Sequence, residues 1–215
     1  MHRDAGSDVT QLHTGTFRNE QQLAPGSVLV VGGGNSGIQI AAELAENRPV
    51  YLSVGQSRLH LPERILGKPV FSYMRALGLL TAPAESWLGK RLSSVPDPII
   101  GYHGAIRRLM RSGQLRMMPR TLSLAGQTAF FADGSTARVS NIIWATGYRS
   151  DYGWLAVPGA LDEYGRPLHT RGVSPVPGLY YLGLPWQRNR QSALMGGVSV
   201  DARLLADDMI RFLNS

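Results

Sequence analysis

A short glycine-rich segment is the part of this 215-residue chain whose residue types and spacing best suit chemistry. It has the form Gly-x-Gly-x-x-Gly and follows directly after the apolar run Val28–Val31. In such a segment the first glycine permits a tight turn, the second lets the backbone approach a pyrophosphate, and the third lets a helix pack closely on a strand. The N–H groups that open the helix attract phosphate. The pattern predicts a dinucleotide site formed by Gly32, Gly33, Gly34, Asn35, Ser36 and Gly37.

The residues after the next strand indicate which dinucleotide binds. About 20 residues after the first glycine, an NAD-binding domain usually offers a carboxylate to the ribose 2′-hydroxyl. Here Gly55, Gln56, Ser57 and Arg58 stand at that place, and the next acid, Glu63, follows a proline. A guanidinium can bind a 2′-phosphate, and the absence of a carboxylate removes a repulsion. The sequence therefore predicts NADP(H), with Ser57 and Arg58 as contacts, and the alternative is that Arg58 is an ordinary surface arginine.

Other chemistry finds little support in the sequence. Gly34-x-Ser36 resembles the start of a nucleophile elbow, but Ile38 stands where that motif needs glycine. The five histidines are far apart, and the chain has no cysteine, which excludes disulfides, thiolate metal sites and dithiol redox chemistry. We therefore expect no metal site, identify no catalytic side chain, and assign any redox chemistry to a bound cofactor.

Charge and hydropathy limit which binding partners and which cellular compartment we expect for this protein. Lys and Arg total 22 against 15 Asp and Glu, which gives a net charge of +7. The densest basic cluster (Arg107, Arg108 and Arg111) lies on an apparent amphipathic helix, which favours a solvated face over a nucleic-acid patch. No apolar run approaches the ~20 residues of a membrane span, and no leader pattern is visible. We expect a cytoplasmic protein without nucleic-acid or membrane partners.

The elements around the glycines form a βαβ unit of about the 30 residues that such a unit needs. It consists of a strand over 27–31, a helix over 38–46 and a strand over 50–54, and is preceded by a polar arm over 1–26. Hydrophobic periodicity then predicts a helix from 97 or 98 to 113 and a final helix over 199–213. Further strands are predicted over 115–119, 121–132, 136–139, 141–144 and 178–184, with a hairpin turn at Asp133-Gly134. The fold class is α/β, with a Rossmann-like parallel sheet flanked by helices and a β-hairpin layer.

Three segments together resemble the flavin-containing monooxygenase family, and in particular its bacterial members associated with cation efflux. They are Val28–Gly37, Ile142–Tyr148, and Gly178–Leu184 followed by Gly196–Val198. The segment Gln11–Phe17 is similar to the end of the family signature, although the earlier phenylalanine and glycine of that signature fall on Ser7 and Val9 here.

The resemblance implies an oxidoreductase that uses NADPH and FAD and acts on a small-molecule substrate. In such enzymes a flavin domain is interrupted by an NADPH domain, which implies an NADPH-binding domain over 27–144 and the C-terminal part of a FAD-binding domain over 145–215. Gly147, Gly196 and Gly197 would then contact the flavin. Hydride would pass from NADPH to FAD before oxygen is activated.

The family's first flavin-binding strand, glycine turn and helix have no counterpart before Gln11, so the second domain is expected to be incomplete. A homo-oligomer or a partner that supplies the other half would complete it. The alternative is a truncated, catalytically inert dinucleotide-binding or regulatory module. The motifs specify neither the substrate nor the pathway.

Overall fold

The computed structural model describes residues 6–214, which form two compact units. The sheet unit contains residues 6–66 and 97–148, and the helical unit contains residues 67–96 and 149–214. Within residues 6–214, no helix combines the length and the apolar character needed to cross a bilayer.

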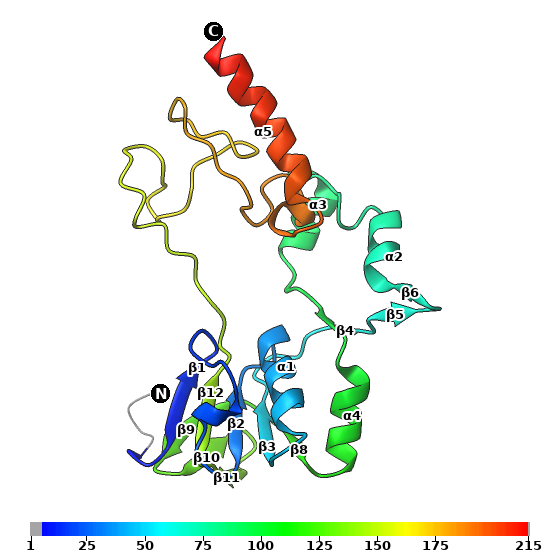
Figure 1. Ribbon diagram of the computed structural model, residues 1–215, viewed down its shortest axis with the longest axis vertical. Helices are drawn as coiled ribbons and strands as arrows, with labels where there is room; N and C mark the ends of the chain where they lie inside the picture. Colours follow the sequence, from blue (N-terminus) through cyan, green and yellow to red (C-terminus); the bar gives the residue numbers. More distant parts are fainter. Residues whose placement is uncertain (1–5, 215) are drawn as a thin grey trace. The chain divides into compact units, whose positions relative to one another are not determined.

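A five-stranded parallel sheet forms the centre of the sheet unit (Figure 1). Its order is β1 (Thr10–His13), β12 (Asn141–Trp144), β2 (Val28–Val31), β3 (Val50–Ser53) and β8 (Leu115–Met118). The neighbours are in parallel register, so that Val28 lies beside both Asn141 and Val50. The central strands β2 and β12 are almost wholly buried, as a parallel sheet covered on both faces requires. The predicted strands over 27–31, 50–54, 115–119 and 141–144 are confirmed within one residue at each end.

The two faces of this sheet are covered by different layers. Helices α1 (Asn35–Leu44) and α4 (His103–Arg111) cover one face. The antiparallel sheet of β9 (Thr121–Ala125), β10 (Thr128–Phe131) and β11 (Thr136–Arg138) covers the other.

The side chains of β2 contact both covering layers, because successive side chains of a strand point to opposite faces of the sheet. Val30 packs in the same core as Leu109 of α4, whereas its neighbour Leu29 packs in the same core as Phe131 of β10. This arrangement confirms the predicted Rossmann-like α/β fold with a β-hairpin layer.

A polar arm was expected over residues 1–26. Residues 1–5 lie outside the described part of the chain, and the segment after them contains a strand. Thr10–His13 form β1 and pair with β12. The side chain of Asn141, fully buried, accepts a hydrogen bond from Ala24 N at 2.8 Å and donates one to Ala24 O at 2.9 Å, which holds the segment before β2 to the sheet. The sequence Thr-Gln-Leu-His has only one aliphatic residue, so its pairing with β12 is what decides that it forms a strand.

Two other predicted elements have different bounds in the structure, because short strands or residues with left-handed backbone conformations interrupt them. The helix predicted from 97 or 98 begins at His103, because β7 (Ile99–Ile100) pairs with β4 (His60–Leu61) and Tyr102 adopts a φ of 58°. The strand predicted over 121–132 is split into β9 and β10 by a turn at Gly126, whose φ is 56°. The hairpin at Asp133-Gly134 is confirmed, and it joins β10 to β11.

In the helical unit, residues 67–96 group with the C-terminal region. Ala84 N donates a hydrogen bond to Arg188 O at 2.7 Å, a contact that no local pattern reveals. The helix predicted over 199–213 is confirmed as α5. Helix α5 spans Val198–Leu213, and the remaining elements of residues 6–214, all short, are η1 (Glu20–Gln22), β5 (Arg64–Ile65), β6 (Lys68–Pro69), α2 (Val70–Ala76), α3 (Trp87–Ser93) and η2 (Arg190–Ala193).

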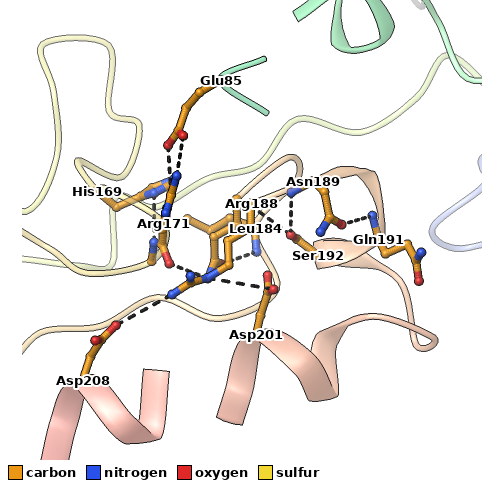
Figure 2. A network of polar contacts seen from close by, with 12 residues as sticks. Glu85, His169, Arg171, Leu184, Arg188, Asn189, Gln191, Ser192, Asp201 and Asp208 are labelled. Carbon is orange, nitrogen blue, oxygen red and sulfur yellow. Dashed lines mark hydrogen bonds and ion pairs between the residues drawn. The ribbon is translucent and has the colours of Figure 1, made fainter. Parts of the chain in front are cut away.

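Ion pairs and hydrogen bonds join the loops of the helical unit (Figure 2). Arg188 lies 4.0 Å from a carboxylate oxygen of Asp201 and 3.7 Å from one of Asp208, both on α5. Arg171 pairs with Glu85 at 2.7 Å, and this guanidinium holds the pKa of Glu85 below its ordinary value.

The predicted strand over 178–184 is wrong. Only one isolated bridge, from Tyr180 to Val173, occurs there among the described residues. Gly178 and Gly183 adopt φ values of 77° and 83°, and this left-handed backbone interrupts a strand ladder at both ends of the segment.

Candidate dinucleotide-binding site

The glycine turn joins β2 to α1, and its first and third glycines are required by close packing. Gly32 has a φ of 121°, and a Cβ on it would lie 2.2 Å from the carbonyl oxygen of Ala145. A Cβ on Gly37 would lie 1.9 Å from the carbonyl oxygen of Gly32. Any larger residue at either position would force backbone apart, so these two glycines hold the start of α1 against the strand ends.

The second glycine of the pattern is different, because it faces open space. A Cβ on Gly34 would have no heavy atom within 4 Å. Gly34 also has a φ of −81°, which any residue can adopt, so neither packing nor backbone strain explains a glycine there. The open space is what a pyrophosphate would need to approach the backbone.

The open space belongs to a cavity of about 320 Å³, which lies at the low end of the usual size range of ligand pockets. Residues that follow all five parallel strands contribute to its wall, so the cavity lies at the carboxyl edge of the sheet, where open α/β sheets bind ligands. The lining residues are Thr14, Gly32, Gly33, Gly34, Asn35, Ser36, Gly55, Gln56, Arg58, Arg120, Ala145, Thr146, Gly147 and Tyr148.

The electrostatics of the cavity favour an anion. Helix α1 begins at Asn35 with neither a side-chain cap nor an acidic residue in its first turn, so its N–H groups and positive dipole end are uncompensated by the protein. Arg58 and Arg120 add two guanidinium groups. Among the described residues that line the cavity, none carries a carboxylate.

The cavity brings together most of the residues predicted from the sequence. Seven line it, and Gly37 lies behind the turn instead. Ser57 is exposed and is not part of the wall. The seven are Gly32, Gly33, Gly34, Asn35, Ser36, Arg58 and Gly147.

Gly196 and Gly197 belong to the helical unit. Gly196 is exposed, whereas Gly197 is buried and a Cβ on it would lie 2.3 Å from Cβ of Gln191. Close packing of α5 on η2 is therefore enough to explain why residue 197 is a glycine.

Sequence reasoning missed Arg120, Thr14 and Tyr148. The Tyr148 hydroxyl lies 2.9 Å from the Thr14 hydroxyl, and the Tyr148 ring meets the ring of His13 edge-on at 5.2 Å between centroids. Thr14 and Tyr148 follow the neighbouring strands β1 and β12, whose register brings them together. No local signal marks Arg120 among the 22 basic residues, and only the pairing of β8 with β3 places it at the site.

Known proteins resemble this chain over nearly its whole length, although no family model matches it. An uncharacterized CzcO-like oxidoreductase of Geobacillus kaustophilus is 50% identical over 94% of the chain, which spans 58% of that protein. The indole-3-pyruvate monooxygenase YUCCA4 of Oryza sativa is 28% identical over 94% of the chain, which spans 51% of it.

A solved flavin-containing monooxygenase from Stenotrophomonas maltophilia has the same fold over 99% of the chain, with a TM-score of 0.69 and 22% identity. The chain spans 57% of that structure's length. These matches confirm the resemblance predicted from the motifs, and they show that the chain corresponds to somewhat more than half of each of these proteins.

Proposed function

We propose that this chain, a relative of CzcO-like oxidoreductases and flavin-dependent monooxygenases, is the NADPH-binding portion of such an oxidoreductase. The observation that carries the proposal is the open face of Gly34 at the start of α1, on the carboxyl edge of five parallel strands. When bound, NADPH supplies a hydride for a flavin, and the reduced flavin supplies the reactivity toward oxygen.

The residues of the sheet unit have separate roles in this proposal. Backbone N–H groups after Gly34, with the dipole of α1, bind the pyrophosphate. Arg58, in the loop that follows β3, binds the 2′-phosphate of the adenosine ribose with charge-assisted hydrogen bonds. Gly32 and Gly37 keep the turn tight enough for both contacts.

The flavin part of the proposal depends on the family relationship. Gly147 follows β12 with a φ of 93°, and a Cβ there would meet no heavy atom within 4 Å, so its surroundings leave room for a ligand. Gly196 is exposed and precedes the N-cap residue of α5, and its contact with the flavin rests on the family relationship alone. The chain contains only one Gly-x-Gly-x-x-Gly segment, so we expect it to bind NADPH and to hold FAD weakly without a partner or a second copy. A small-molecule substrate and a cytoplasmic location complete the proposal.

Titration of the purified chain with NADPH and NADH by calorimetry tests the first part. We expect saturable binding with a preference for NADPH, and absence of binding to either dinucleotide would refute the proposal.

The flavin absorbance of the purified chain and its NADPH oxidation, with and without added FAD, test the second part. A monomer that contains stoichiometric flavin and consumes oxygen in the presence of NADPH would refute the expectation that the chain alone binds FAD weakly. NADPH binding without oxidation, even with added FAD, would instead support an inert dinucleotide-binding module.

A further inference from the structure

Arg120 is fixed beside the end of β3 by hydrogen bonds on both of its sides. The buried hydroxyl of Ser53, the last residue of β3, donates to Pro119 O at 2.9 Å. The same hydroxyl accepts a hydrogen bond from Thr121 N at 2.9 Å. Arg120 O accepts one from Ala132 N at 2.9 Å. Its backbone is therefore tied both to the parallel sheet and to the antiparallel layer.

The side chain of Arg120 crosses the loop that follows β3. A Cβ on Gly55 would lie 3.1 Å from Nε of Arg120 and 3.6 Å from its Nη2. The guanidinium thus lies against Gly55, in the region where an NAD-binding domain usually presents its carboxylate to the ribose. Arg120 and Arg58 both line the cavity there.

Both guanidinium groups lack an acidic partner. Within residues 6–214, neither Arg58 nor Arg120 takes part in an ion pair. Two like charges that line the same cavity repel each other, and a dianionic ligand that binds both removes that repulsion. Because the pyrophosphate has its own binding groups at the start of α1, these two side chains remain for a different phosphate.

We propose that Arg120 is a second specificity-determining residue, which acts with Arg58 to bind the 2′-phosphate of NADPH and so to favour NADPH over NADH. This inference rests on the proposed function. It differs in assigning the selectivity to a residue that follows β8, more than 60 positions beyond Arg58 in the chain. Loss of one charge-assisted contact is expected to weaken NADPH binding about 10-fold or more.

The test uses the full chain and calorimetric titration with adenosine 2′,5′-bisphosphate, adenosine 5′-monophosphate, NADPH and NADH. Arg120→Ala should weaken binding of the two ligands with a 2′-phosphate about 10-fold or more and leave the other two unchanged. Arg120→Lys should retain part of the selectivity, because it keeps the charge but loses the planar fork. Arg116→Ala removes an exposed arginine of β8 that does not line the cavity, and it should change nothing.

A second variant adds a charge in place of removing one. Gly55→Asp puts a carboxylate beside Arg120, where it can pair with the guanidinium and accept a hydrogen bond from a ribose 2′-hydroxyl. NADPH affinity should fall and the preference should move toward NADH. Thermal unfolding of each variant verifies that it folds.

The outcomes separate this inference from the proposed function. A wild-type chain that binds no dinucleotide overturns both. A wild-type chain that prefers NADPH, with Arg120→Ala retaining that preference, overturns the role of Arg120 alone. An equal loss for adenosine 5′-monophosphate and the bisphosphate also overturns it, because Arg120 would then not distinguish the 2′-phosphate.

Discussion

Replacing Gly34 by valine is the sharpest perturbation of the proposed site. Gly34 precedes the first residue of α1, has an extended conformation that any residue adopts, and would have no heavy atom within 4 Å of an added Cβ. The Cβ of the new side chain would therefore enter open space without displacing protein atoms. We expect Gly34→Val to fold and to lose dinucleotide binding.

The two expected effects differ greatly in size. An apolar side chain in place of a helix N-cap glycine costs at most about 1 kcal/mol, which lowers Tm by about 2–4 °C in a chain of this length. In the proposed complex the pyrophosphate would accept charged hydrogen bonds from the turn, each of which contributes about 1.5–3 kcal/mol. Preventing two of them costs about 3–6 kcal/mol, or a 10²- to 10⁴-fold increase in Kd.

Calorimetric titration with NADPH measures the binding effect, and circular dichroism with thermal unfolding measures the stability effect. Gly104→Ala is a matched control, because Gly104 lies on α4 outside the cavity wall and also has no heavy atom within 4 Å of an added Cβ. It should leave the Kd unchanged. Gly37→Ala should instead lower stability, because its Cβ would lie 1.9 Å from a backbone oxygen.

A folded Gly34→Val protein that binds NADPH with the wild-type Kd would refute the reasoning. The glycine turn would then serve only to join β2 to α1, and the cavity would need another ligand.

Three further predictions concern other contacts. Arg58→Ala should weaken NADPH binding about 10- to 100-fold and leave NADH unchanged in calorimetric titration; equal affinities in the wild type would remove Arg58 from the site. Asn141→Leu should lower the free energy of unfolding by about 2–4 kcal/mol in urea, because the Ala24 N–H and C=O lose their buried partner; an unchanged midpoint would contradict this. A hydrogen bond from Arg108 lowers the pKa of Glu46 below 4.5, so this pair contributes stability above about pH 4.5 and loses it as the pH falls through the lowered value. In Glu46→Gln the free energy of unfolding, measured by denaturation, should therefore fall less steeply as the pH is lowered than in the wild type. An identical fall in both proteins would show that the pair contributes nothing.

The glycine turn and the strands beside it were predictable because their signals are local. An apolar run followed by three glycines at fixed spacing determines a tight strand-to-helix turn, whatever the rest of the chain does. The later strand over 178–184 was predicted from a similar apolar pattern and proved wrong. There, Gly178 and Gly183 in left-handed conformations override the tendency of the tyrosines and leucines between them to form a strand.

The sequence by itself therefore determined the βαβ unit and the direction of α1, because each depends on residues within one short segment. Only the tertiary structure decided that Thr10–His13 join the sheet and that Thr14, Arg120 and Tyr148 meet around one cavity. These residues follow three different strands, which are far apart in the chain. The register of the parallel sheet brings the ends of those strands to one edge, and no spacing within the sequence records that register.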